Sequence, residues 1–173
     1  MGVYHHEMGV KAGGKMAILA GAGPMGMGMI DYALHGDRQP AQLIVTDINE
    51  DRLARARELF TEEDAAKQGV KLTFVNTKDM ADPAAYLKEI SGGGFDDVYV
   101  YAPISSVVEL ASDILGRDGC LSFFAGPTDN KFSAKLNFYD VHYNSTHVIG
   151  TTGGNTADMI ESLELTAAGR IHP

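Results

Sequence analysis

The sequence is nearly free of cysteine and tryptophan. Its 173 residues include a single cysteine, Cys120, and no tryptophan. One cysteine cannot close a disulfide within the chain, which fits a protein of the reducing cytoplasm. The chain also lacks any apolar run near the roughly 20 residues that a transmembrane helix needs. Its first residues contain no basic segment followed by an apolar one, so we expect no signal peptide.

Positive charge is also scarce. Lys and Arg number 14 against 23 Asp and Glu, which gives a formal net charge of −9 and a pI of about 5.0. An acidic chain is poorly suited to nucleic acids and to anionic membranes, so we expect neither as a partner. Apolar residues make up 45% of the chain and charged residues 21%, as in ordinary soluble proteins. The length suffices for one domain with a good core.

The most informative segment joins a short apolar run to a glycine-rich turn and a helix. The turn, Gly21-Ala22-Gly23-Pro24-Met25-Gly26, has the pattern G-x-G-x-x-G. In a dinucleotide-binding unit, the first glycine permits a tight turn, the second lets backbone approach a pyrophosphate, and the third lets the helix pack on the strand. Pro24 suits a first helical turn, where free N–H groups and the helix dipole face the diphosphate. We therefore predict cofactor contacts from Gly21, Gly23, Pro24, Met25 and Gly26.

An acidic residue ends the next apolar run. Asp47 lies 21 residues after Gly26, the place of a carboxylate that binds the adenosine ribose. The same carboxylate would repel a 2′-phosphate, which favours NAD over NADP, although Arg52 and Arg38 would soften that preference. Ile48 and Arg52 are further predicted cofactor contacts. Alternatively, Asp47 is only a strand-end turn residue or the cap of the helix that follows.

Apolar, strand-like runs alternate with helical patterns along the whole chain. Nearly continuous apolar strands separated by helices indicate a parallel sheet covered on both faces. We therefore predict a single α/β domain over residues 1–173, a Rossmann fold with a doubly wound six-stranded parallel sheet. The predicted strands are Met16–Gly21, Gln42–Asp47, Lys71–Val75, Asp97–Ala102, Cys120–Ala125 and Thr146–Thr151. The predicted helices are Met25–His35, Glu50–Phe60, Pro83–Ile90 after an Asp82 cap, Ser105–Leu115 and Thr156–Ala168.

Two other segments have simpler patterns. Leu136–Tyr139 is interpreted as a short edge strand, and Glu62-Glu63-Asp64 as a solvated acidic run. The chain contains no Ser-His-Asp order, no P-loop lysine and no CxxC, so these chemistries are not expected.

Ligands of such a sheet bind at the carboxyl ends of its strands, near the point where the strand order reverses. We predict that Tyr101, Ala102 and Pro103 lie beside the adenine or its ribose, and that Ala125 and Gly126 lie near the nicotinamide. Either loop is equally explained as a rigid strand exit or a turn. The loop Thr151–Gly154, after the sixth strand, is a further candidate.

These motifs resemble the nucleotide-binding half of the zinc-type medium-chain dehydrogenases, such as sorbitol and alcohol dehydrogenases. Among that family, the chain looks most like sugar-phosphate reductases of the L-sorbose 1-phosphate type. The resemblance covers nearly the whole chain. It is carried by Gly9–Lys15, by the GxGPxG turn, by Asp47 with Arg52-Leu53 and Ala56, by Val148–Thr151, and by Leu163–Pro173.

The resemblance implies a function and a missing part. It implies the NAD-binding domain of a zinc-dependent oxidoreductase that moves hydride between a nicotinamide cofactor and a sugar, polyol or sugar phosphate. Family members hold the catalytic zinc and most of the substrate pocket in another domain, which this chain lacks. We therefore expect no catalytic or metal-binding residue here and no turnover by this chain alone. The resemblance also implies a homodimer, paired through the last strand, Thr146–Thr151.

Two other functions remain open at this point. S-adenosylmethionine methyltransferases also combine a glycine turn with an acid after the second strand, although they hold no pyrophosphate. A non-catalytic nucleotide-sensing module would bind the same cofactor without chemistry. A neighbouring zinc domain of Cys, His and Glu ligands would favour the dehydrogenase over the sensing module.

Overall fold

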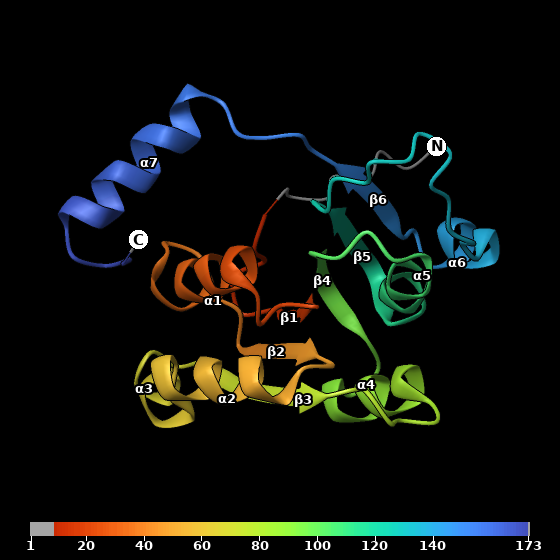
Figure 1. The fold of residues 1–173 in the computed structure, drawn as a ribbon, viewed down its shortest axis with the longest axis horizontal. Coiled ribbons are helices and arrows are strands. Elements are labelled where there is room, and N and C mark those ends of the chain that lie inside the picture. The colour runs from red at the N-terminus through yellow and green to blue at the C-terminus, as the bar shows by residue number, and fades with distance from the viewer. Residues whose placement is uncertain (1–8, 173) are drawn as a thin grey trace.

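The structure is a computed structural model that describes residues 9–172. Along this part of the chain six strands alternate with seven helices (Figure 1). The strands are β1 Lys15–Leu19, β2 Gln42–Asp47, β3 Lys71–Asn76, β4 Phe95–Val100, β5 Leu115–Phe123 and β6 His147–Gly150. The helices are α1 Pro24–His35, α2 Glu50–Leu59, α3 Glu62–Lys67, α4 Pro83–Ser91, α5 Ser105–Asp113, α6 Phe138–Tyr143 and α7 Thr156–Ala167.

All six strands run parallel in one sheet with the order β3-β2-β1-β4-β5-β6. This order confirms the predicted doubly wound sheet of the Rossmann type. The strand order reverses between β1 and β4. Leu19, which ends β1, lies beside Thr46 of β2 and Val100 of β4. The carboxyl ends of these three strands therefore meet at one edge, where ligands of such sheets bind.

Each face of the sheet carries an apolar core. Successive strand residues point to opposite faces, so Met16 and Ile18 of β1 join one core while Ala17 and Leu19 join the other. Figure 1 shows α1, α2 and α3 on one side of the sheet and α4, α5 and α6 on the other. Burial on both faces explains why the strands are almost continuously apolar.

Side-chain caps begin several helices. Asp82 accepts a hydrogen bond from the backbone N–H of Ala85 at 2.9 Å and so begins α4, as predicted. Helix α7 begins with a reciprocal capping box formed by Asn155 and Asp158. These bonds satisfy first-turn donors that have no partner within the helix, which is why polar residues stand at these boundaries.

The predicted edge strand at Leu136–Tyr139 is wrong, because Phe138–Tyr143 forms helix α6. The side chain of Asn137 accepts the backbone N–H of Tyr139 at 3.0 Å, which starts a helical turn in place of a strand. The neighbouring position beside β5 is occupied by β6.

A second difference lies at the acidic run, whose residues are exposed but form the first turn of α3. Thr61 caps this helix by accepting the backbone N–H of Asp64 at 3.0 Å. The acids complement the positive end of the helix dipole. A third difference is that β5 begins at Leu115, which pairs with Phe95 before a register shift in the ladder.

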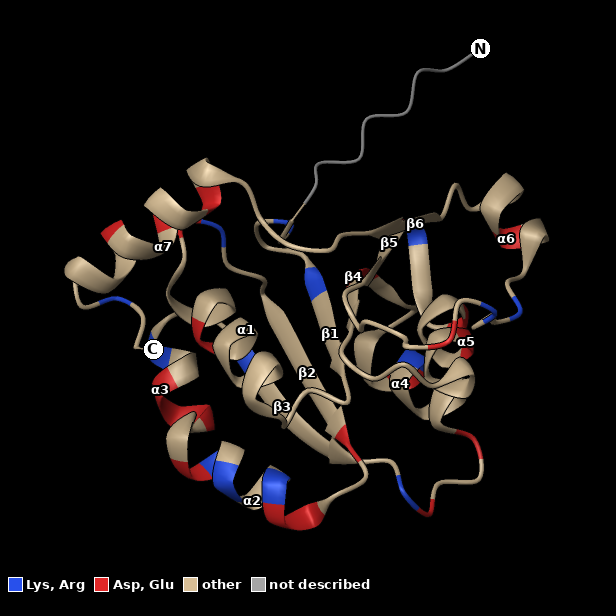
Figure 2. Cartoon of the chain, turned by 45° about the horizontal axis from the view of Figure 1, so that its top comes forward, with Lys and Arg blue, Asp and Glu red and all other residues tan. Residues whose placement is uncertain are grey.

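Charged side chains gather on the outer helices, α2 and α3 above all, whereas the strands carry few of them (Figure 2). Within the described residues, every helix is too short or too polar to cross a bilayer. In parallel sheets of this type, ligands bind at the carboxyl edge of the strands.

Candidate nucleotide-binding site

The glycine turn connects β1 to α1 at the carboxyl edge of the sheet. Gly21 donates its backbone N–H to the Thr46 carbonyl at 2.9 Å, which ties the turn to β2. Sequence reasoning assigned the tight turn to Gly21, but the left-handed residue is Ala20, with φ of 54°. A non-glycine residue in that region carries backbone strain, which is typical of functional loops.

The three glycines of the motif are needed for different reasons. A Cβ on Gly26 would lie 2.0 Å from the Gly21 carbonyl oxygen, so the contact between α1 and β1 requires glycine, as predicted. A Cβ on Gly21 would lie 2.5 Å from Ile18 Cγ2. A Cβ on Gly23 would meet no described atom within 4 Å. The packing of this chain therefore accounts for Gly21 and Gly26 and leaves Gly23 unexplained.

The first turn of α1 faces the same edge. Pro24 occupies the first helical position. Gly23 is the N-cap, and among the described residues no side chain forms a capping hydrogen bond at this end of α1. The turn contains no acidic residue. Its backbone N–H groups and the positive end of the helix dipole are suited to a phosphate group. Pro24 is exposed and the Met25 side chain is 58% exposed beside them.

Asp47, at the end of β2, is 5% exposed and accepts three backbone N–H groups. One carboxylate oxygen accepts from Ala22 at 3.2 Å, and the other accepts from Ile48 at 2.8 Å and Asn49 at 3.0 Å. The bonds from Ile48 and Asn49 make Asp47 the strand-end turn residue of the alternative interpretation, and the bond from Ala22, which sequence reasoning missed, holds the glycine turn against the end of β2. A carboxylate has about four acceptor positions, so capacity remains for a further donor.

The alternative in which Asp47 caps the following helix is wrong. Asn49 is the cap of α2, because its side chain accepts the backbone N–H of Arg52 at 3.1 Å. The side chain of Ile48 is 61% exposed, and Arg52 is also exposed at this edge. These two residues are therefore accessible where the sequence predicted cofactor contacts.

The loops after β4 and β5 lie at the same edge. Tyr101 donates its N–H to the Leu19 carbonyl at 3.2 Å, and Ala125 donates to the Val100 carbonyl at 3.2 Å. The Tyr101 ring is half-buried and its centroid lies 5.6 Å from that of Phe124. Burial raises the pKa of Tyr101 to about 12, so its phenol stays neutral. Ala102 is half-buried, whereas Pro103 and Gly126 are exposed.

One polar group that sequence reasoning missed stands beside Asp47. Asn76 ends β3 in register with Asp47 and donates its side-chain N–H to Glu50 at 2.6 Å. The hydrogen bond from Asn76, followed by that from Arg57, lowers the pKa of Glu50. In the sequence, Asn76 could have been found as a polar residue at the end of the third apolar run. The Thr151–Gly154 loop instead bonds to itself, since the Thr151 hydroxyl donates to the Gly153 carbonyl at 2.6 Å.

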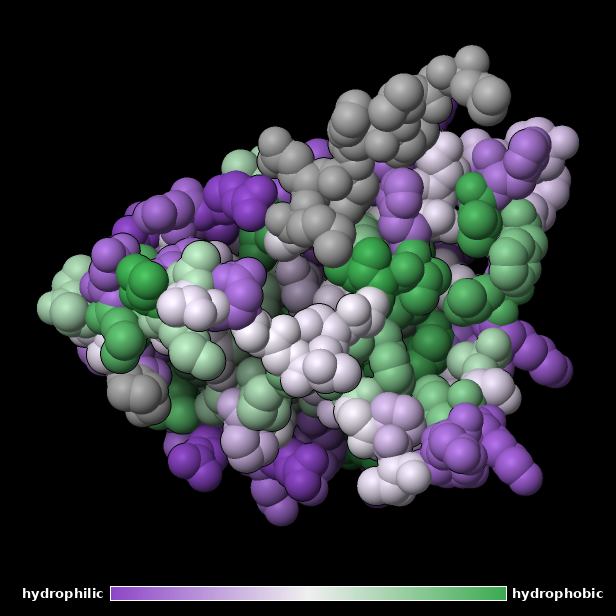
Figure 3. Space-filling view, turned by 90° about the horizontal axis from the view of Figure 1, so that it is seen from above, coloured by the Kyte–Doolittle hydropathy of each residue, from purple (hydrophilic) through white to green (hydrophobic). Residues whose placement is uncertain are grey.

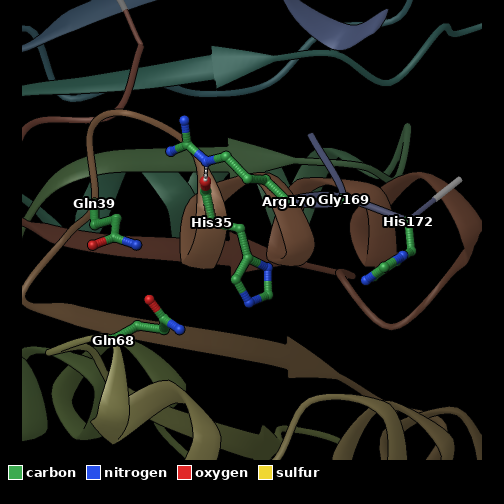
Figure 4. A pocket seen from close by; sticks show the side chains of 6 residues that line it. All are labelled: His35, Gln39, Gln68, Gly169, Arg170 and His172. Carbon is green, nitrogen blue, oxygen red and sulfur yellow. Dashed lines mark hydrogen bonds between the residues drawn. The ribbon is translucent and has the colours of Figure 1, made fainter. Parts of the chain in front are cut away.

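A cavity of about 320 Å³ lies at the other end of α1 and is distinct from this edge (Figure 4). Its lining residues are His35, Gln39, Gln68, Gly169, Arg170 and His172. The Arg170 guanidinium donates to the His35 carbonyl at 2.9 Å and to Asp37 at 2.6 Å. Buried Asp31 accepts the backbone N–H of His172 at 2.6 Å. These bonds hold the segment after α7 against α1. The cavity is therefore the gap left where these two segments pack together.

Residues 9–172 do not fit a metal ion. Within that range, no group of three or more His, Cys, Asp or Glu side chains is arranged to hold one. Burial also raises the pKa of the Cys120 thiol to about 11, which keeps this thiol protonated. The carboxyl edge therefore offers backbone donors, the buried carboxylate of Asp47, the polar side chains of Asn76 and Arg52, and exposed apolar side chains.

The chain is similar to known proteins over nearly its whole length. The chain is 56% identical over 172 residues to mannitol-1-phosphate 5-dehydrogenase of Aliivibrio fischeri, covering 99% of this chain and 41% of that protein. It is 45% identical to L-sorbose 1-phosphate reductase of Klebsiella pneumoniae, over 98% of this chain and 40% of that protein. The chain thus spans about two fifths of the length of these relatives.

Solved structures share the fold. A zinc-binding dehydrogenase of Sinorhizobium meliloti, solved bound to NADP, has a TM-score of 0.73 at 19% identity, covering 95% of this chain and 44% of that one. An alcohol dehydrogenase zinc-binding domain protein of Burkholderia ambifaria has a TM-score of 0.73 at 24% identity, over 94% of this chain and 40% of that one.

A family model settles the assignment. The model described as zinc-binding dehydrogenase matches residues 24–168, which include α1 and the ends of β2, β4 and β5. This match lends no support to the methyltransferase alternative or to a sensing module. The chain belongs to the zinc-binding dehydrogenase family.

Proposed function

We propose that this chain binds NAD(H) as the nucleotide-binding domain of a zinc-dependent oxidoreductase that acts on a sugar, polyol or sugar phosphate. The observation that carries the proposal is the open space at Gly23. The chain's own packing does not require glycine there, whereas a pyrophosphate approaching the backbone would. The substrate class rests on the two relatives named for sugar phosphates, L-sorbose 1-phosphate among them.

Different residues of the carboxyl edge contact different parts of the cofactor. The N–H groups of Gly21–Gly26 and the start of α1 hold the pyrophosphate. Asp47 accepts a hydrogen bond from the adenosine ribose, while Ile48 and Arg52 border the adenine on one side and Tyr101–Pro103 on the other. Ala125 and Gly126 lie beside the nicotinamide ribose and ring. When bound, the dinucleotide supplies or accepts the hydride.

Asp47 favours NAD over NADP in this proposal. Its carboxylate is buried and accepts three N–H groups, so it cannot swing away from a 2′-phosphate without releasing the glycine turn. A phosphate placed beside it meets like charge. Arg52, on the exposed first turn of α2, is the cation that would offset part of this repulsion.

The zinc belongs elsewhere in the parent enzyme under this proposal. The described residues offer no arrangement for a metal, and the relatives are about two and a half times as long as this chain. The polarisation of the substrate carbonyl is therefore assigned to a second domain. This chain contributes cofactor binding and orientation.

Two further properties follow from the family and the edge of the sheet. We infer a homodimer in which β6 pairs with its mate, because β6 ends the sheet and an apolar edge strand invites pairing. We also infer a cytoplasmic location, because the single cysteine, Cys120, is buried and unpaired by disulfide.

The test is a fluorescence titration of the chain with NADH, followed by an assay with sugar phosphates. The proposal expects saturable NADH binding and no oxidation of NADH by the chain alone. Absence of NADH binding by a folded chain would overturn the cofactor assignment. Turnover by this chain alone would overturn the assignment of catalysis to a second domain.

A further inference from the structure

The surface beside the end of β2 is mainly polar, unlike the apolar patches of the molecule. Exposed hydrophobic side chains gather at the end that holds α7 and over the half that holds β5, β6 and α6 (Figure 3). The first turn of α2 instead carries the acidic residues Glu50 and Asp51 (Figure 2). The strand β3, which pairs with β2, ends in the polar residue Asn76. Charged and polar side chains therefore stand beside the end of β2, where the proposed function puts the adenosine ribose.

Asn76 holds Glu50 from the strand next to β2. Asn76 pairs with Asp47 in the ladder between β2 and β3, and adjacent strands lie about 4.8 Å apart. The side-chain carbonyl of Asn76 accepts the backbone N–H of Lys78 at 3.0 Å. This bond leaves the amide nitrogen to donate to Glu50 Oε2, which it does at 2.6 Å. Glu50 is therefore held within about 10 Å of Asp47, the strand spacing plus the reach of one hydrogen-bonded amide.

The other oxygen of Glu50 has a donor of its own. The Arg57 guanidinium donates to Glu50 Oε1 at 2.7 Å and lies 5.9 Å from the centroid of the Phe74 ring. The hydrogen bond from Asn76, and then that from Arg57, lowers the pKa of the Glu50 carboxyl. The Glu50 side chain is nevertheless 58% exposed. A long surface side chain ordinarily samples several rotamers, whereas two donors hold this carboxylate in one place and in its ionised form.

The two carboxylates differ in how they can act on a ligand. Asp47 is 5% exposed and is engaged by three backbone N–H groups, so it acts by direct contact. Glu50 faces solvent, so its charge acts through water on any anion bound nearby. Its partner Arg57 approaches from the last turn of α2, seven residues or about 10 Å further along the helix axis. The side of Glu50 toward the end of β2 is therefore left negative.

We propose that Glu50 is a second residue that selects NAD(H) against NADP(H), and that Asn76 is the positioning residue that holds it there. This rests on the proposed function, in which Asp47 faces the adenosine ribose. The 2′-phosphate of NADP(H) would meet the charge of Glu50 in addition to that of Asp47, whereas the free 2′-hydroxyl of NAD(H) is neutral. Neutralising Asp47 alone therefore leaves one carboxylate opposed to NADP(H).

The experiment is a pair of fluorescence titrations, one with NADH and one with NADPH, for the chain and three variants. Each titration is made at an ionic strength of about 0.01 M and again at about 1 M, where the Debye length falls from about 30 Å to about 3 Å. Glu50→Gln removes the charge and keeps a carbonyl oxygen that accepts from Asn76. Asn76→Ala releases Glu50. Glu58→Gln is the matched control, because it removes the same charge from an exposed position of α2 about 12 Å further along the helix.

The proposal expects Glu50→Gln to raise the ratio of NADPH affinity to NADH affinity by about three-fold to five-fold at low ionic strength, the size of a charge effect transmitted through water. Asn76→Ala should change the ratio less and in the same direction, and Glu58→Gln should leave it unchanged.

The rise should disappear at high ionic strength, because salt screens exposed charges. An unchanged ratio in Glu50→Gln, an equal rise in Glu58→Gln, or a rise that persists at high ionic strength would overturn the role of Glu50 and retain NADH binding. Failure of the unmodified, folded chain to bind either dinucleotide would overturn the proposed function and this inference with it.

Discussion

Replacing Gly23 with alanine should strongly weaken cofactor binding while leaving the fold intact. The backbone at Gly23 has φ of −85° and ψ of 174°, an extended conformation that alanine adopts freely. The added Cβ meets no described atom within 4 Å. The free chain therefore accommodates the methyl group, and only a ligand seated against this turn would collide with it.

The expected stability change for Gly23→Ala is close to zero, because two small effects oppose each other. Alanine restricts the unfolded chain and stabilises the fold by about 0.4–1 kcal/mol. Gly23 is also the N-cap of α1, where alanine is less favourable than glycine by roughly 0.5–1 kcal/mol. For a chain of this size, the melting temperature should stay within about 3 °C of the original.

The loss of binding should be much larger. Displacing the pyrophosphate from the turn costs at least one charge-assisted hydrogen bond, worth about 1.5–3 kcal/mol. NADH affinity should therefore fall by about 10-fold to 100-fold. Isothermal titration calorimetry gives the affinity, and a thermal melt of the same sample gives the stability.

Two other glycines provide matched controls. Gly28, in the exposed part of α1, also has open space where a Cβ would stand, and Gly28→Ala should raise stability by about 1 kcal/mol without changing NADH affinity. Gly26→Ala should unfold or strongly destabilise the chain, because its Cβ would lie 2.0 Å from the Gly21 carbonyl oxygen. A folded Gly23→Ala variant that binds NADH as well as the original would refute the placement of the pyrophosphate.

Three further predictions concern other groups. Asp47→Asn should weaken NADH binding and raise NADPH affinity relative to NADH, measured by parallel titrations; an unchanged ratio would contradict its role at the ribose. Burial raises the folded-state pKa of Tyr101 to about 12. The contribution of its neutral phenol to the stability of the fold is therefore fully present below pH 10 and is lost as the pH rises toward 12. In urea denaturation, the free energy of unfolding of Tyr101→Phe should fall by about 2 kcal/mol less than that of the original chain over this pH range. An identical pH dependence of the two chains would argue against a buried phenol. Cys120, which is 3% exposed, should resist alkylation until the chain unfolds; rapid labelling of the native chain would show that its strand opens.

The sheet and the gathering of the candidate site residues at its carboxyl edge were predictable because local patterns encode them. Apolar runs broken by caps such as Asp82 indicated alternating strands and helices, which predicted a doubly wound parallel sheet, and the observed order β3-β2-β1-β4-β5-β6 is of that type. The motif Gly21–Gly26 placed the turn correctly. Its neighbours at the ends of β2, β4 and β5 followed because parallel strands bring their carboxyl ends to one edge.

What was missed depends on contacts between distant parts of the chain. The positive φ of Ala20 arises where the turn meets β2, and the three N–H bonds to Asp47 require β1 and β2 to be side by side already. Helix α6 was missed because Leu136–Tyr139 is short and apolar, and a short apolar run suits a strand or a helix equally. The cap at Asn137 decided between them.

The most direct test of the central claim is a calorimetric titration of this chain with NADH, then NADPH, then S-adenosylmethionine. If the glycine turn holds a pyrophosphate and Asp47 faces the ribose, NADH binds, NADPH binds much more weakly, and S-adenosylmethionine gives no heat of binding. Heat from S-adenosylmethionine without binding of either nicotinamide dinucleotide would contradict the claim, because that ligand has no pyrophosphate for the turn to hold.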